Sequence, residues 1–213
     1  MLTDLSAAML DIAARRARAL GIANIGTTVC SADYLPFHDA TFGSVSVRFG
    51  YMFFPDVAKA TAEFVRVLEP GGRLCSSVWV KPEENPRTTI AMHAIVTEAV
   101  IALQDPDGPN MYRCAAPGHV SLLYEGAGLR DGAEWDVDVE LVTRSPEQYW
   151  EMISEHVSLA VGALQQVDEP ARERIRARAV AEVSAFVNDG RVRVPGVCTV
   201  HRGNEVAQER RRP

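Results

Sequence analysis

The side chains of this sequence that could take part in chemistry are carboxylates and an arginine. The usual patterns of catalytic nucleophiles and metal ligands are missing. The four cysteines are scattered and form no C-x-x-C pair, so we expect no zinc site and reduced thiols in a cytosolic protein. His93, His119 and His156 are isolated along the chain, which is more typical of structural or exposed histidines than of catalytic ones. The sequence therefore identifies no catalytic residue and predicts no metal, and the groups of interest are those that bind a ligand.

Arg48 stands at the carboxyl end of a predicted strand over 42–49. In open α/β sheets ligands bind at that edge. A guanidinium there can hold the carboxylate of a cofactor or of an anionic substrate. The alternative is an arginine paired with a surface acid. Tyr112, Arg113 and His119, in or near a long polar loop, are further candidates for contact with a substrate.

The elements that must position these groups alternate in the first part of the chain. Apolar periodicity and turn residues predict a helix over 6–20, capped by Asp4 or Ser6 and ended by Gly21. The elements that follow are a strand over 27–32, a strand over 42–49, a helix over 57–68, a Glu-Pro-Gly-Gly turn and a strand over 73–80. This order predicts an α/β fold, a mostly parallel sheet with helices on both faces.

The second part of the chain is less regular, and its elements are predicted singly. They are a loop over 81–87, helices over 88–103, 118–126, 145–164 and 169–186, a loop over 105–117, and strands over 135–141 and 191–200. We expect one domain over 1–200, in which 81–120 caps a substrate, and a disordered tail over 201–213. The alternative for this basic tail is contact with an acidic partner.

Four segments in order carry a family resemblance. They are Thr3-Asp4-Leu5-Ser6-Ala7-Ala8-Met9-Leu10, Ser31-Ala32-Asp33-Tyr34-Leu35-Pro36-Phe37, Arg48-Phe49-Gly50-Tyr51-Met52-Phe53-Phe54-Pro55-Asp56 and Val67-Leu68-Glu69-Pro70-Gly71-Gly72-Arg73-Leu74. Together they resemble class I S-adenosylmethionine-dependent methyltransferases of the ubiquinone/menaquinone C-methyltransferase type. The resemblance covers residues 3–80 and is loose beyond them. It implies a Rossmann-like methyltransferase fold and S-adenosylmethionine as the cofactor.

The resemblance also implies roles for single residues. Asp4 corresponds to the acidic residue that accepts hydrogen bonds from the ribose hydroxyls, and its alternative role is to cap the following helix. Ser31 and Ala32 correspond to the segment that contacts the adenine, although Ser31 replaces the usual Asp or Asn. Asp33 either compensates for that replacement or is a solvated loop residue.

Apolar residues near these motifs are predicted to contact the cofactor or substrate, or to pack in the core. Leu5 is placed at the cofactor, and Met9 packs either on the purine or in the core. The segment Tyr51-Met52-Phe53-Phe54 either walls a substrate pocket or packs beneath the next helix, with packing favoured for Phe54. The turn Pro70-Gly71-Gly72 is structural, since it needs glycine for a positive φ.

The resemblance implies a chain that is incomplete at its N-terminus. Only three residues precede Asp4, which leaves no room for the family's first strand and Gly-rich loop. By resemblance that strand is central in the sheet, so its loss is expected to leave unpaired strand edges and an exposed apolar seam.

Composition narrows the functional classes. A net charge of −6 argues against a general nucleic-acid binder, and no stretch approaches the ~20 apolar residues of a membrane span. We expect a cytoplasmic enzyme that methylates carbon, oxygen or nitrogen of a small molecule. The alternative is a non-catalytic remnant with an incomplete cofactor site. A nicotinamide-dependent oxidoreductase is a weaker reading, since a tyrosine–lysine pair at short helical spacing is missing.

Overall fold

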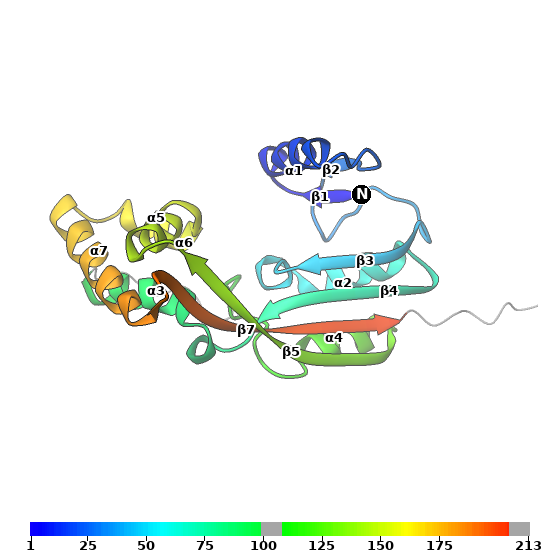
Figure 1. Ribbon diagram of the computed structural model, residues 1–213. Helices are drawn as coiled ribbons and strands as arrows, with labels where there is room; N and C mark the ends of the chain where they lie inside the picture. The colour runs from blue at the N-terminus through cyan, green and yellow to red at the C-terminus, as the bar shows by residue number, and fades with distance from the viewer. Residues whose placement is uncertain (99–107, 205–213) are drawn as a thin grey trace, which may run out of the picture. The chain divides into compact units, whose positions relative to one another are not determined.

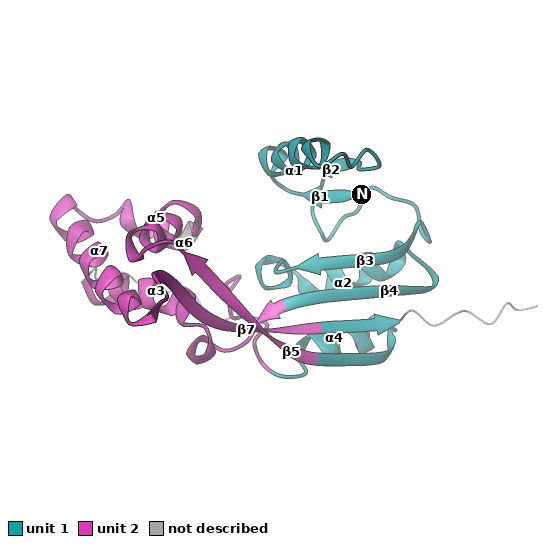
Figure 2. Cartoon of the chain, in the orientation of Figure 1, with its two compact units in different colours: residues 1–77, 117–134, 201–213 teal, residues 78–116, 135–200 magenta. Residues whose placement is uncertain are grey.

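The computed structural model describes residues 1–98 and 108–204. The chain divides into two compact units (Figure 2). Unit 1 comprises residues 1–77, 117–134 and 201–213, and unit 2 comprises residues 78–116 and 135–200. Strands β4, β5 and β7, whose bounds follow below, contribute residues to both units.

Unit 1 begins with a short β-α-β segment. Strand β1 (Leu2–Asp4) pairs in parallel with β2 (Thr27–Val29), and α1 (Ala7–Ala19) connects them (Figure 1). Ser6 is the N-cap of α1, because its side chain accepts a hydrogen bond from the Met9 N–H over 3.3 Å. Gly21, with φ +72°, follows the helix end as predicted.

The larger sheet has the strand order β3-β4-β7-β5. Strand β3 pairs in parallel with β4, β6 pairs antiparallel with β7, and Figure 1 shows β7 running opposite to β4. The sheet is therefore mixed, and the predicted α/β class is confirmed. Within the described residues no ladder joins β1 or β2 to this sheet. The bounds are β3 Phe42–Arg48, α2 Val57–Arg66, β4 Leu68–Trp79, β5 Arg130–Thr143, β6 Val187–Asn188 and β7 Arg191–Asn204.

The predicted Glu-Pro-Gly-Gly turn lies inside β4 and does not precede it. Phe42 pairs with Leu68 but Ser44 already pairs with Arg73, so the residues between bulge out of the ladder. Gly71 has φ +82°, which requires glycine, and a Cβ on Gly72 would lie 2.8 Å from the Glu69 carbonyl oxygen. The turn is structural, as expected.

The core of unit 1 is built from aromatic residues under β4. Tyr51, in a 3₁₀ turn (Tyr51–Phe53), is fully buried, and its ring lies 5.9 Å from Phe64 of α2 and 6.3 Å from Tyr124 of α4 (His119–Gly126). The Tyr124 hydroxyl donates to Ser76 Oγ over 2.9 Å. The buried Tyr124 hydroxyl is therefore satisfied by a hydrogen bond, as buried polar atoms usually are.

Four helices of unit 2 enclose a second core that includes Ile95, Tyr149, Ile153 and Ile175. The single helix predicted over 145–164 is wrong, because Val157 is extended (φ −91°, ψ 103°) and separates two helices. The bounds are α3 Pro86–Glu98, α5 Pro146–His156, α6 Ser158–Leu164 and α7 Glu169–Val183, with 3₁₀ turns at Pro82–Glu84 and Ser184–Phe186.

Two predicted boundaries also change. The strand expected over 135–141 is longer, and β7 continues past residue 200 to Asn204. His201, expected at the start of the tail, is 3% exposed inside that strand. The remaining tail residues, 205–213, and the predicted helix and loop residues 99–107 lie outside the described residues.

Candidate functional site

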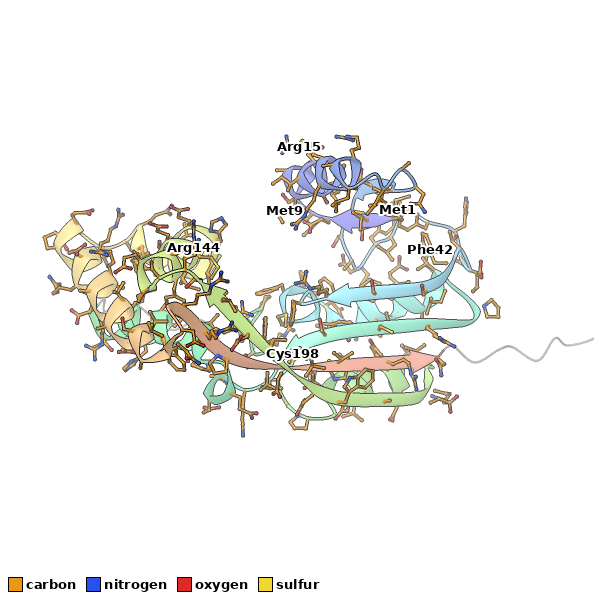
Figure 3. The ribbon with its side chains drawn as sticks, viewed as in Figure 1. Met1, Met9, Arg15, Phe42, Arg144 and Cys198 are labelled. Atoms are coloured by element: carbon orange, nitrogen blue, oxygen red, sulfur yellow. The ribbon has the colours of Figure 1, made fainter. Side chains whose placement is uncertain are left out.

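A groove of about 550 Å³ lies within unit 1, at residues from β1, the turn after β2, and β3. Its size is in the range of small-molecule sites. Figure 3 labels Met1 and Phe42, which line the groove near the amino-terminal starts of β1 and β3. At the carboxyl ends of the strands it is lined by Asp4, Leu5, Cys30, Ser31, Ala32, Arg48, Phe49 and Gly50.

Asp4 is the last residue of β1 and lies beside the chain that leaves β2. The Cys30 N–H donates to the Asp4 carbonyl over 3.1 Å. The side chain of Asp4 is exposed, and its Oδ1 accepts the Ser6 N–H over 2.8 Å. The predicted alternative is thus partly realised, since Asp4 orders the residue before the helix while Ser6 is the cap. Leu5, the next residue, is 72% exposed in the groove wall.

The segment after β2 forms a tight turn. The Tyr34 N–H donates to the Ser31 carbonyl over 3.2 Å, and the Ser31 hydroxyl donates to Asp33 Oδ1. The hydrogen bond from Ser31, assisted by Lys59 at 3.6 Å, lowers the pKa of Asp33. Ser31 and Ala32 line the groove, whereas Asp33 is not among the lining residues. Asp33 therefore holds Ser31 and does not itself face the groove.

Arg48 is the last residue of β3, as predicted, and lines the same groove. Its guanidinium carbon lies 5.6 Å from the centroid of the Phe49 ring. Among the residues that the structure describes, it forms no ion pair. The alternative of an arginine paired with a surface acid is therefore not what the structure shows.

The segment 51–54, predicted either to line a substrate pocket or to pack beneath the next helix, divides into two pairs of residues. Tyr51 and Met52 are 0% exposed and belong to the core, so of the two alternatives for them packing holds and the pocket wall does not. Phe53 and Phe54 do line the groove. Phe54 also packs on Tyr51, with ring centroids 5.6 Å apart, so both of its readings hold.

Sequence reasoning missed other aromatic residues of the groove. Phe37 and Phe42 line it and meet edge to face, with ring centroids 5.0 Å apart. They precede and begin a strand, so no periodicity marks them. Met9 lies neither in the groove lining nor in the core, because it is 56% exposed on α1. Of the long-loop candidates, Tyr112 lies in unit 2 and His119 begins α4 in unit 1.

Arg66, at the end of α2, fixes the loop that carries part of the groove wall. Its Nη2 donates to the Leu35 carbonyl and its Nη1 to the Phe37 carbonyl, both over 2.9 Å. The same guanidinium contacts Glu63 Oε1 and Asp39 Oδ1, both at 2.7 Å, and these partners raise the pKa of Arg66. Leu35 is tied a second time, since its N–H donates to Glu63 Oε2 over 2.8 Å.

This clamp predicts an acid-sensitive step in stability. Hydrogen bonds from Arg66 hold the pKa of Glu63 below its usual value, so Glu63 favours the folded state while it is ionised. The contribution is complete above the ordinary glutamate pKa and is lost as the pH falls through the lowered, folded-state value. We expect the melting temperature of the wild type to drop more steeply than that of Glu63→Gln between about pH 5 and pH 3. This range spans the ordinary pKa of a glutamate side chain. Parallel curves for the two proteins would contradict this role.

The described residues hold no group of three or more His, Cys, Asp or Glu side chains that is placed to bind a metal ion, and all four cysteines are free thiols. Burial raises the pKa of Cys30, the thiol in the groove wall. Within the described part of the chain no helix has the length and apolar character needed to cross a bilayer.

The fold is that of Rossmann-like methyltransferases. The chain is similar to YcgJ protein of Bacillus subtilis (TM-score 0.56, 18% identity, 96% of this chain and 81% of that one). It is also similar to phosphoethanolamine N-methyltransferase 2 of Haemonchus contortus (TM-score 0.53, 15% identity, 96% and 42%) and to the [4+2]-cyclase SpnF (TM-score 0.53, 19% identity, 96% and 66%). A cyclase among these neighbours shows that the fold does not fix the reaction.

Sequence similarity to known proteins covers a shorter part of the chain than the structural similarity does, and it indicates a more specific family. Residues 1–95 match the model of the ubiE/COQ5 methyltransferase family. It is similar to the ubiquinone/menaquinone biosynthesis C-methyltransferases UbiE of Cellvibrio japonicus (42% identity, 38% of this chain and 33% of that protein) and of Saccharophagus degradans (33%, 50% and 45%). The chain thus spans a third to less than half of the length of these curated relatives.

Proposed function

We propose that this protein binds S-adenosylmethionine in the groove of unit 1 and transfers its methyl group to a small-molecule acceptor. The observation that carries the proposal is the meeting of Asp4, Ser31 and Arg48 in one groove, inside the segment that matches the methyltransferase family. They follow or end three different strands, as expected for ligand binding at the carboxyl edge of an α/β sheet.

The groups in the groove suit the parts of this cofactor. The exposed Asp4 carboxylate has acceptor capacity for ribose hydroxyls beyond the Ser6 N–H that it already holds. The Ser31 hydroxyl gives its proton to Asp33, so its oxygen is oriented to accept from an amine such as that of adenine. Arg48 supplies a guanidinium without a described ion-pair partner for the amino acid carboxylate.

When bound, S-adenosylmethionine supplies an electrophilic methyl group on a sulfonium. The protein's part is then to align the acceptor and to exclude water. Phe49, Phe53 and Phe54 give the groove an apolar wall for this purpose. A general base is needed only for an acceptor that must lose a proton. The net charge of −6 favours a small acceptor over a nucleic acid, and we place the reaction in the cytoplasm.

The proposal is tested by titrating the folded protein with S-adenosylhomocysteine and then supplying methyl-labelled S-adenosylmethionine with a panel of quinone, carboxylate and amine acceptors. Saturable binding with a Kd on the order of micromolar and label in one acceptor class are expected. Absence of binding by a chain that circular dichroism shows to be folded would refute the cofactor assignment. Binding without label transfer would refute the transfer step.

A specific observation supports a second, non-catalytic candidate. In the described residues β1 pairs with β2 and β3 with β4, and no strand ladder joins the two walls of the groove. A cofactor site needs walls that are held at fixed separation. A protein that retains the fold but acts through contacts with other proteins would show neither cofactor binding nor label transfer in the same experiment.

A further inference from the structure

Unit 2 contains an arginine in an environment unlike that of its other arginines. Arg87 is the second residue of α3, and its guanidinium carbon lies 4.2 Å above the ring centroid of Trp79, the last residue of β4. Arg87 Nε is enclosed, and it has no hydrogen-bond partner among the residues that the structure describes. The other arginines of this unit that form ion pairs do so with glutamates: Arg172, Arg174, Arg176, Arg178 and Arg193.

The charge of Arg87 is not balanced by any carboxylate among the described residues. The groups that act on it electrostatically are the hydroxyls of Tyr112 and Tyr149 and the thiol of Cys198. Burial raises the pKa of each of these three groups, so all are neutral at pH 7. A guanidinium keeps its proton under these conditions, so a half-buried cation stands among aromatic rings with no counter-ion in the described part of the chain.

The backbone around Arg87 is fixed from two sides. Asn85 accepts the Val197 N–H over 3.2 Å and returns a bond to the Val197 carbonyl over 3.1 Å. The Tyr149 hydroxyl donates to the Arg87 carbonyl over 3.0 Å. The absence of a side chain at Gly196 makes room for the Arg87 side chain, since a Cβ at residue 196 would lie 3.2 Å from Arg87 Cδ. The guanidinium is therefore held in place before any ligand arrives, which favours binding.

A buried charge without a partner destabilises a folded protein. The contact with Trp79 offsets part of that cost, but it gives the Nε–H no acceptor, and none is found among the described residues. Such a group is typical of a ligand site, where function is kept at the expense of stability. A planar guanidinium between aromatic side chains matches a carboxylate or phenolate oxygen on a flat organic molecule, by bidentate bonding and stacking together.

We propose that Arg87, held over Trp79 and next to the Thr88–Tyr112 pair, is a binding site for the anionic group of a small aromatic molecule. The Tyr112 hydroxyl lies 2.6 Å from Thr88 Oγ1, one residue from Arg87, and supplies a polar group at the same place. The site lies wholly in unit 2. It goes beyond the proposed function and does not depend on it, because an anion can be titrated without cofactor.

The test uses benzoate as the probe and benzamide as its uncharged isostere, with binding followed by calorimetry on the full chain. Wild type is expected to bind benzoate saturably in the millimolar range and benzamide at least about tenfold more weakly. Arg87→Met should lose benzoate binding by about the same factor, and Arg191→Met, which removes an exposed arginine of β7, should not. No saturable benzoate binding by the folded wild type, or equal binding by Arg87→Met, would overturn the proposal.

Thermal stability without ligand separates a binding role from a structural one. Arg87→Met keeps a long side chain over Trp79 and removes an unbalanced charge, so we expect a melting temperature equal to or above that of wild type. A clear fall in the melting temperature would show that Arg87 serves folding and would count against the site. Failure of S-adenosylhomocysteine binding leaves both measurements unaffected.

Discussion

Replacing Asp4 with alanine should weaken binding of S-adenosylhomocysteine by about 1–3 kcal/mol, measured by titration calorimetry. The reason is that two ribose hydroxyls would lose a charged acceptor at the end of β1, in a groove partly shielded from water. The loss is expected in the affinity, with little change in the fold. Ser6 remains as the cap of α1 through its bond from the Met9 N–H.

Two further variants make this result specific. Asp11→Ala removes an exposed carboxylate from α1 itself and should leave the affinity unchanged. Asp4→Asn keeps an oxygen for the Ser6 N–H but removes the charge, so it should fall between wild type and alanine. If Asp4→Ala and wild type bound with the same Kd, the ribose role would be lost and Asp4 would serve only the entry to the helix.

Replacing Arg66 with methionine should destabilise the protein by about 2–3 kcal/mol, a fall of roughly 4–12 °C in melting temperature. One guanidinium satisfies the carbonyls of Leu35 and Phe37 together with the carboxylates of Glu63 and Asp39. Methionine fills similar space but leaves these acceptors without a donor. Because Leu35 and Phe37 line the groove, affinity for S-adenosylhomocysteine should fall as well.

The controls address geometry and charge separately. Arg66→Lys retains the charge but not the planar fork, so it should recover less than half of the lost stability. Arg16→Met, on the exposed side of α1, removes an arginine for which no contact with a described acidic residue is found, and it should be neutral. A lysine variant as stable as wild type would show that only the charge at residue 66 matters.

The sequence alone predicted the elements whose signals are local. Ser6 and Gly21 mark the ends of α1, and the Pro-Gly-Gly turn marks a positive φ at Gly71. Capping and turn residues act within about four positions, so their effect can be read without knowing the fold. The same holds for the motifs in which Asp4 and Arg48 end their strands and Ser31 follows β2.

Longer-range contacts set the features that the sequence did not reveal. Val157 is extended because the helices on either side of it pack separately on the core of unit 2, although the local pattern allowed one helix. Residues 201–204 are polar or small, yet they form a strand because β7 has neighbours to pair with. Tertiary pairing outweighs local preference in both places.

Local sequence patterns were enough to predict the fold class, the short elements of the first 80 residues and the polar side chains at or just after the ends of their strands. Tertiary contacts determine which of those side chains line one groove. They also bury Tyr51 in the core while Phe53 lines the groove, and they place Asp33 as the acceptor of the Ser31 hydroxyl outside the groove lining. The tertiary structure alone brought Arg66 to a loop some 30 residues away and fixed Asn85 against Val197 across 112 residues. Contacts at that separation depend on how strands and helices pack, which no window of neighbouring residues encodes.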